Sequence, residues 1–259
     1  MSGGGVAVEF GVLGPLRVLD NNVPVRLGPA KTRCLLAALL CGSGQPISVD
    51  TLVDELWHHT PPPTARKTLQ VYVCRLRRVL GPDRRVGFDS TSYQMALYPG
   101  ELDASRFDAA MARARECRRN ADLDGAAGYL HAAAGLWRGE PFSDVRGGGL
   151  IEAERVRFTE QRLLMFEERA EIDLARGLAA ELVPELESLV LVHPFRDRMR
   201  AALMRALYHS GQAVHALEIY QHGRDLLRDE LGLDPGPELR RLHQSMLRND
   251  LAGSGTSPG

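Results

Sequence analysis

Cysteine is scarce in this sequence, and its distribution argues against disulfide chemistry. The four copies, Cys34, Cys41, Cys74 and Cys117, contain no C-x-x-C pair. A chain of 259 residues can bury enough apolar surface to fold without disulfide bridges. We therefore expect reduced thiols, as in a protein of the cytoplasm, and no disulfide framework.

Long apolar runs are also missing. The longest run, from Cys34 to Cys41, is far too short to span a lipid bilayer. The first 14 residues contain neither the basic segment nor the long apolar core of a secretory signal. These two absences predict a cytoplasmic protein that has no membrane partner.

Motifs for phosphate binding and catalysis are missing as well. The sequence has no G-x-x-x-x-G-K-[ST] loop and no G-x-S-x-G nucleophile motif. His209, His215 and His222 lie near one another, but no cysteine or carboxylate completes a zinc-binding spacing. Residues 147–149 are three glycines that could bind an anion before a helix, although a flexible turn is the favoured interpretation. We expect no enzyme activity, no metal and no cofactor.

The net charge is close to zero, yet the basic residues are concentrated in one part of the chain. Residues 1–98 contain 11 basic and 7 acidic residues, whereas residues 99–259 contain 21 and 26. Residues 62–86 contain seven basic residues and one acid, Asp83. This local excess of positive charge indicates a nucleic-acid partner.

The first hundred residues alternate between strand and helix patterns. Val6, Val8, Phe10 and Val12 recur every second residue, and two further strand-like runs flank an Asn21-Asn22 turn, which predicts a small antiparallel meander. Three helices are expected next: a buried one that includes residues 34–41, one that starts after Ser48, and one over residues 64–80. Runs at residues 84–88 and 93–97 then predict a hairpin.

Beyond residue 100 the pattern is entirely helical. Helices are expected at about 104–119, 122–137, 150–176, 178–192, 196–210, 212–230 and 237–248. Gly177 and Gly211 are 34 residues apart, which is the period of tetratricopeptide-type repeats. We place a domain boundary at residues 98–100, which gives a winged helix-turn-helix domain at 6–98 and a tetratricopeptide-like helical domain at 103–250. The predicted fold class is α with a minor β part.

The third predicted helix has one apolar face and one basic face. At 100° per residue, Leu69, Val73 and Leu76 share the buried side. Lys67, Val71, Cys74 and Arg78 lie on the opposite side, flanked by Gln70, Arg75 and Arg77. A basic helix that follows another helix and precedes a hairpin is the plan of a winged helix-turn-helix protein, whose recognition helix enters the major groove. The alternative interpretation is a solvated basic face on a structural helix.

The residue types on this face suit base reading. Lysine can donate to guanine, glutamine can pair with adenine, and a valine methyl can contact a thymine methyl. Cys74 is interpreted as a small residue that permits close approach to DNA, with a redox switch as the alternative. Arginines at the edges would hold phosphates. The complete predicted DNA-binding set is Lys31, Arg33, Arg66, Lys67, Gln70, Val71, Cys74, Arg75, Arg77, Arg78 and Tyr93.

Several segments resemble a known family of regulators. The sequences TARKTLQ and VYVCRLRR at residues 64–78 are similar to the recognition helix of OmpR-type winged-helix domains, and more closely to the actinomycete antibiotic regulatory proteins, the SARP family. FGVLGPL at 10–16 and SVDTLVDELW at 48–57 resemble that family's opening strand and second helix. LWRG at 136–139, HP at 193–194 and ELGLDPGPEL at 230–239 resemble its bacterial transcriptional activation domain.

The resemblance implies an activator of genes for secondary-metabolite, or antibiotic, biosynthesis. Family members bind direct repeats near promoters as side-by-side protomers and recruit RNA polymerase holoenzyme, which implies a location on the nucleoid. The predicted wing departs from the family pattern at residues 89–93, and Asp89 there would repel phosphate. More of the binding is therefore expected on the third helix and on Lys31 and Arg33, whose alternative interpretation is solvated first-turn charges.

The favoured interpretation is thus a sequence-specific DNA-binding activator, but two other functions stay open at this point. One is a protein-binding scaffold in which the helical repeats are the function and the basic helix is incidental. The other is a one-component sensor whose helical half takes a small ligand. Leu186, Leu189 and Tyr220 are interpreted as core residues rather than as the lining of a ligand pocket.

Overall fold

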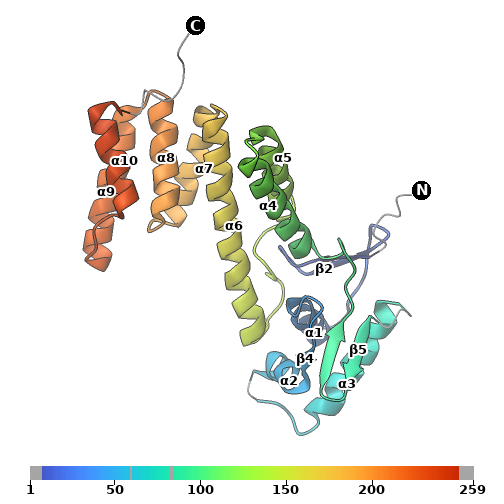
Figure 1. The fold of residues 1–259 in the computed structure, drawn as a ribbon. Helices are drawn as coiled ribbons and strands as arrows, with labels where there is room; N and C mark the ends of the chain where they lie inside the picture. The colour runs from blue at the N-terminus through green and yellow to red at the C-terminus, as the bar shows by residue number, and fades with distance from the viewer. Residues whose placement is uncertain (1–7, 59, 82–84, 251–259) are drawn as a thin grey trace, which may run out of the picture. The chain divides into compact units, whose positions relative to one another are not determined.

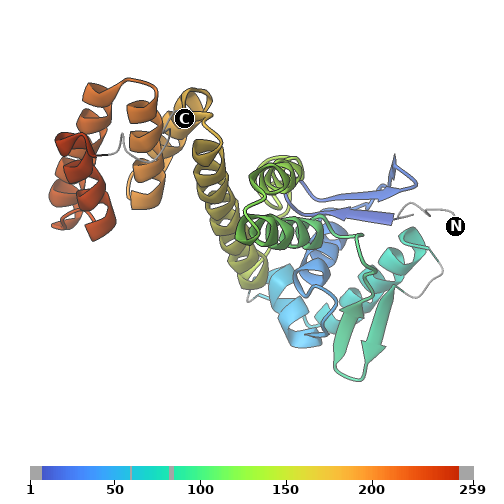
Figure 2. The same cartoon turned by 45° about the horizontal axis from the view of Figure 1, so that its top comes forward.

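The computed structural model describes residues 8–58, 60–81 and 85–250. Val6 and Arg84, which the sequence places in strands, lie outside the described residues. The chain divides into two compact units, which Figure 1 and Figure 2 show from two directions. The N-terminal unit contains the chain up to Glu116 together with Gly128–Met165, and the C-terminal unit contains Cys117–Ala127 and the chain from Phe166 onward.

The N-terminal unit begins with the predicted meander. Strands β1 (Val8–Gly11), β2 (Arg17–Asp20) and β3 (Val23–Pro24) form an antiparallel sheet in that order. Asn21 and Asn22 both have positive φ, 46° and 67°, as a tight two-residue hairpin turn requires. The sequence-based meander is therefore confirmed for the described residues, with a shorter third strand than expected.

Three helices follow, as predicted. They are α1 (Ala30–Cys41), α2 (Val49–Trp57) and α3 (Ala65–Val79), and α1 packs against both of the others. The hydroxyl of Ser48 accepts the backbone N–H of Thr51 at 3.0 Å and so caps α2, which begins after Ser48 as predicted.

The predicted hairpin consists of β5 (Val86–Asp89) and β6 (Ser92–Met95). A two-residue strand that the sequence does not reveal, β4 (Ile47–Ser48), pairs with β6 and completes a sheet of order β4-β6-β5. Two residues are too few for a periodic pattern to appear. The backbone N–H of Val49 also donates to the carbonyl of Thr91 at 2.9 Å, so the tip of the hairpin is fixed to the start of α2.

The remaining chain is helical, as predicted. The helices are α4 (Asp103–Arg119), α5 (Leu123–Ala134), α6 (Gly149–Ala175), α7 (Ala179–Val192), α8 (Asp197–His209), α9 (Ala213–Leu231) and α10 (Pro237–Arg248). The turns at Gly177 and Gly211 have positive φ, 82° and 79°, which glycine adopts without strain. No helix in the described part of the chain has both the length and the apolar character that crossing a lipid bilayer requires.

The N-terminal unit continues past residues 98–100, where the sequence pattern changes, and a buried ion pair crosses that point. The guanidinium of Arg85 pairs with Glu101 at 2.6 Å, and both side chains are almost fully buried. Arg85 contributes to the positive charge counted at residues 62–86, but its charge is neutralised inside the protein.

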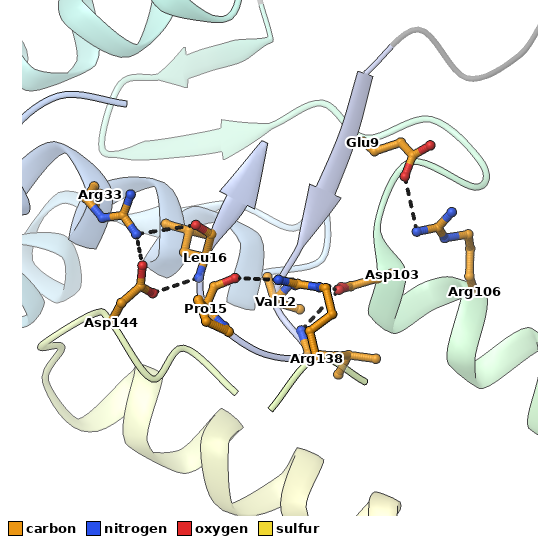
Figure 3. A network of polar contacts seen from close by, with 10 residues as sticks. Glu9, Val12, Pro15, Leu16, Arg33, Asp103, Arg106, Arg138 and Asp144 are labelled. Atoms are coloured by element: carbon orange, nitrogen blue, oxygen red, sulfur yellow. Dashed lines mark hydrogen bonds and ion pairs between the residues drawn. The ribbon is translucent and has the colours of Figure 1, made fainter. Parts of the chain in front are cut away.

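Two carboxylates from the helical part hold the loop after β1 (Figure 3). Asp103 accepts the backbone N–H groups of Val12 at 2.8 Å and Leu13 at 3.1 Å, and Arg138 donates to the same carboxylate at 3.2 Å. Asp144 accepts the N–H of Leu16 at 2.7 Å. The LWRG segment thus supplies an arginine that secures the loop rather than a surface contact.

A third carboxylate, that of Glu55 on α2, closes the start of α6. Glu55 is 3% exposed and accepts the backbone N–H groups of Gly148 at 2.7 Å, Leu150 at 2.5 Å and Ile151 at 3.4 Å. A side chain at position 148 would meet the Glu55 carboxylate, since an ideal Cβ would lie 2.9 Å from its Oε1. The glycine segment that could have held an external anion is therefore occupied by the protein's own carboxylate.

Glu55→Gln is expected to destabilise the protein by about 1–3 kcal/mol, because the amide retains one acceptor oxygen and places N–H groups against buried N–H groups. Thermal and urea unfolding measure this. Glu152→Gln is the matched control. Glu152 lies in the first turn of α6, whose start Glu55 contacts, but its side chain is exposed. Equal unfolding midpoints for the two variants would contradict the assigned role of Glu55.

In the C-terminal unit, an aromatic pair joins α9 to α10. The rings of Tyr220 and His243 are stacked with centroids 3.8 Å apart and planes 7° from parallel. Burial lowers the pKa of His243 below its usual value of 6.5, and the positive charge of Arg224 contributes in the same direction. The folded state therefore favours the neutral imidazole.

Stability is expected to decrease as the pH falls from about 7.5 through the pKa of an unfolded-chain histidine near 6.5, because the unfolded chain takes up this proton before the folded one does. In His243→Gln this contribution is absent, so the free energy of unfolding should change less over the same pH range. Urea unfolding at several pH values measures the slope, with the exposed His131→Gln as control. A slope in His243→Gln equal to that of the unaltered protein would contradict the assignment.

Candidate nucleic-acid interface

Helix α3 is held by one apolar face. Ala65, Leu69, Val73 and Leu76 are buried, and the helix packs against α1 and α2. This is the face that the sequence pattern predicts. Because the apolar side faces the core, the opposite side of the helix is left at the surface.

Eight of the predicted residues lie exposed on this one helix. They are Arg66, Lys67, Gln70, Val71, Cys74, Arg75, Arg77 and Arg78. The helix has five basic residues and no acidic one over its whole length. Val71 is 49% exposed although it is apolar, so an unburied methyl group lies among the charges. Such a surface offers donors to base edges and phosphates together with one apolar contact.

At the start of α3 the positive charge is partly neutralised. Arg66 pairs with Asp50 of α2 at 2.5 Å, and both side chains are largely exposed. An exposed pair of this kind contributes little to stability and is screened by salt. Arg66 can therefore exchange its carboxylate partner for a phosphate at low energetic cost.

Aromatic rings and cations support the middle of α3. The rings of Trp57 and Tyr72 lie 6.4 Å apart at 25°, and the guanidinium of Arg75 lies 5.7 Å from the centre of the Tyr72 ring. On the far side, the Lys31 ammonium lies 5.9 Å from the Trp57 ring and donates to the carbonyl of Leu56 in the last turn of α2. The Tyr72 ring thus orients the Arg75 guanidinium, while Lys31 stabilises the C-terminal end of α2.

Arg77 joins α3 to the hairpin. Its Nε and Nη2 both donate to the carbonyl of Val86, at 2.9 and 2.7 Å. This bidentate contact fixes β5 relative to α3, so Arg77 serves the placement of the wing in addition to its exposed charge.

The structure does not bring two other predicted residues to the exposed face of α3. Arg33 pairs with Asp144 and donates to the carbonyl of Leu16 at 3.3 Å, so its guanidinium is used within the protein (Figure 3). Tyr93 is 5% exposed, and its ring lies 4.7 Å from that of Phe88. Burial raises the pKa of the Tyr93 hydroxyl. Tyr93 lies on the inner side of β6, which the position of its run in the sequence does not reveal.

Three aromatic residues near this surface are absent from the predicted set. The ring of Trp57 lies beside that of Tyr72, and the guanidinium of Arg75 lies over the Tyr72 ring. Phe88 on the wing is 51% exposed. Their aromatic character was the available signal, but the pairing of Trp57 with Tyr72 depends on the packing of α2 against α3.

Comparisons with known proteins agree with this architecture. The profile described as transcriptional regulatory protein, C terminal, matches residues 22–89, and that of the bacterial transcriptional activator domain matches residues 102–247. The first covers α1 to β5 with the exposed helix α3, and the second covers the helical part.

Individual relatives share most of the chain. Regulatory protein AfsR of Streptomyces coelicolor is 40% identical over 246 residues, which are 95% of this chain and 25% of that protein. Regulatory protein DnrI of Streptomyces peucetius is 33% identical over 253 residues, covering 94% of this chain and 93% of DnrI. The present chain thus spans about a quarter of the length of AfsR and nearly all of DnrI.

A solved structure shows the same fold. The structure of Mycobacterium tuberculosis EmbR in complex with a low-affinity phosphopeptide superposes with a TM-score of 0.90 at 32% identity, covering 94% of this chain and 65% of that one. Together with the two profile matches and the extent of the match to DnrI, this identifies the chain as a member of the SARP family of transcriptional regulators, built from an OmpR-type winged helix and a bacterial transcriptional activator domain.

Proposed function

We propose that this protein is a sequence-specific DNA-binding transcriptional activator whose helix α3 enters the major groove. The observation that carries the proposal is the exposed face of α3, which has basic and amide side chains, no acid and one unburied methyl-bearing residue. A major groove about 12 Å wide admits a helix of this kind.

The positions on α3 divide the work between bases and phosphates. Lys67, Gln70 and Val71 are exposed in the first half of α3, and the N-terminal part of a recognition helix is the part that meets base edges. Arg75 and Arg78 are exposed in its second half and Arg66 at its start, and we assign these three to the flanking phosphates. Cys74 has a small side chain near the centre of the exposed face, so the helix backbone can approach the bases. Lys31 and Arg77 act by holding α2 and the wing in place.

The wing adds little positive charge. Asp89, the last residue of β5 before the turn, is exposed and repels phosphate, while Phe88 next to it presents an apolar ring. Most of the binding energy is therefore assigned to α3, in line with the charge distribution of the sequence.

The helical part is assigned to protein contacts. The family resemblance supports a pathway-specific activator of antibiotic biosynthetic genes that binds promoter direct repeats as side-by-side protomers and recruits RNA polymerase holoenzyme. The acidic excess of residues 99–259 makes this part a poor DNA surface. Action at promoters places the protein on the nucleoid.

Substitutions on α3 should separate base reading from phosphate binding. Lys67→Ala and Gln70→Ala are each expected to weaken binding to the selected site by about 1–3 kcal/mol with little change on a random duplex. Arg78→Ala should weaken binding to both duplexes by a similar factor and reduce the slope of log affinity against log salt by about 1. Fluorescence anisotropy titrations over a range of salt concentrations measure all three variants.

Arg113→Ala serves as the control, since it removes an arginine from α4 outside the winged helix. Equal losses on the selected and the random duplex for Lys67→Ala, Gln70→Ala and Arg78→Ala would contradict the division of roles. Binding with no sequence preference at any salt concentration would contradict the proposed function itself.

The ring beneath Arg75 offers a separate test. Tyr72→Leu is expected to weaken DNA binding by roughly two- to fivefold, because a cation–π contact at an exposed site is worth about 0.5–1 kcal/mol. The same substitution in an Arg75→Ala background should have almost no further effect, which the double-mutant cycle measures. Tyr129→Leu on α5 is the control. Additive losses from the two substitutions would show that Tyr72 does not act through Arg75.

A further inference from the structure

The C-terminal unit contains a cavity that neither DNA binding nor the packing of its helices uses. It has a volume of about 310 Å³, and its lining residues come from α7, α8, α9 and the turn between α7 and α8. Helix α8 packs against both α7 and α9 (Figure 1). Its apolar lining consists of Val190, Leu191, Pro194, Leu203, Ile219 and Leu226. Glu187 and His222 lie at its edge and are exposed. The volume falls at the lower end of the range for small-molecule sites.

Among the lining residues, the buried charged side chain is Arg200 of α8. It is 1% exposed. Its Nη1 donates to the carbonyl of Ile219 at 3.1 Å and its Nη2 donates to the carbonyl of Pro194 at 2.6 Å. Its Nε has no hydrogen-bond partner among the described residues. The guanidinium therefore has neutral acceptors but an N–H group left to satisfy.

The carboxylate nearest in sequence is used elsewhere. Asp197, one turn before Arg200 on α8, accepts the backbone N–H of Gly236 at 2.8 Å and so fixes the start of α10. Within the described part of the chain, no carboxylate lies within ion-pair distance of Arg200. Burial lowers the pKa of Arg200, and the charge of Asp197 opposes that shift only as the smaller contribution. A buried guanidinium without a carboxylate is costly, and a bound anion would offset that cost.

The neighbouring helix accommodates this guanidinium. Gly223 lies within α9, and an ideal Cβ at that position would come within 2.3 Å of the Arg200 Nε. Glycine inside a helix costs about 1 kcal/mol relative to alanine. The Arg200 guanidinium thus occupies the space that a side chain at position 223 would fill. It lies beside the cavity and does not extend into solvent.

We propose that this cavity binds a small molecule that has an apolar body and one carboxylate, with the carboxylate paired to Arg200. The apolar lining accepts the body of such a molecule, and the guanidinium supplies the single charged contact that orients it. Glu187 at the edge repels a carboxylate there, which favours the orientation with the acid group inward.

Isothermal titration calorimetry of the full chain with octanoate tests the proposal, with 1-octanol and octylamine as probes of the same chain length. Octanoate is expected to bind at a single site at least tenfold more tightly than either of the others. Equal affinity for octanoate and 1-octanol would overturn the role of the carboxylate, and failure of octanoate to bind would overturn the site.

Two kinds of variant locate the binding. Arg200→Gln keeps hydrogen-bond donors for the carbonyls but removes the charge, and should reduce octanoate affinity at least tenfold. Leu191→Trp places a bulky ring at the cavity and should block octanoate, whereas Val192→Trp, at the adjacent exposed position outside the lining, should not. Thermal unfolding shows whether each variant folds.

The two tryptophan variants test the binding site even if Arg200→Gln fails to fold. Leu191 and Val192 are both highly exposed, so neither substitution disturbs the core. Unchanged octanoate binding in Leu191→Trp would overturn the assignment to this cavity. Unchanged binding in a folded Arg200→Gln protein would overturn the pairing with Arg200. DNA affinity, measured in parallel, should be the same in Leu191→Trp and Val192→Trp, so the outcome is independent of the function proposed for α3.

Discussion

The start of helix α6 leaves backbone N–H groups without partners inside the helix, and the protein satisfies them with a carboxylate from a helix nearly a hundred residues earlier. Glu55 belongs to α2, the first helix of the helix-turn-helix pair, so this one side chain joins the winged helix to the helical part. Asp103 and the buried pair of Arg85 with Glu101 add to the same connection. The N-terminal unit consequently includes α2, α3 and the first part of α6.

This connection also determines how the exposed helix α3 is supported. Because α2 is fixed at its start by the contact of Val49 with Thr91, and at its last turn by Glu55 and Lys31, α3 rests on a rigid neighbour. Trp57 of α2 then supports Tyr72, which in turn supports Arg75. Under the function proposed for α3, an arginine supported in this way loses less side-chain freedom on binding than an unsupported one.

Periodicity predicted most of the fold because the helices are long and each has a regular apolar face. The bounds of α4 through α10 agree with the expected ranges to within about three residues at either end. Strand β4 was missed because two residues carry no period. The exposed residues of α3 could be predicted, since the same periodicity that buries Leu69 and Val73 exposes the opposite side of the helix. Tyr93 and Arg33 could not be placed, because strand orientation and ion pairing depend on distant segments.

The sequence by itself determined the order of elements, the basic face of α3 and the family, because these depend on local periodicity, local charge and short motifs. Only the tertiary structure decided which charges are available to a partner. Three arginines that look alike in the sequence differ in the fold. Arg85 is neutralised by Glu101, and Arg33 pairs with Asp144. Arg200 is buried beside a cavity and has no carboxylate partner among the described residues. The physical reason is that the energy of a charge depends on its partners and on its exposure to water, and folding brings these together from distant parts of the chain.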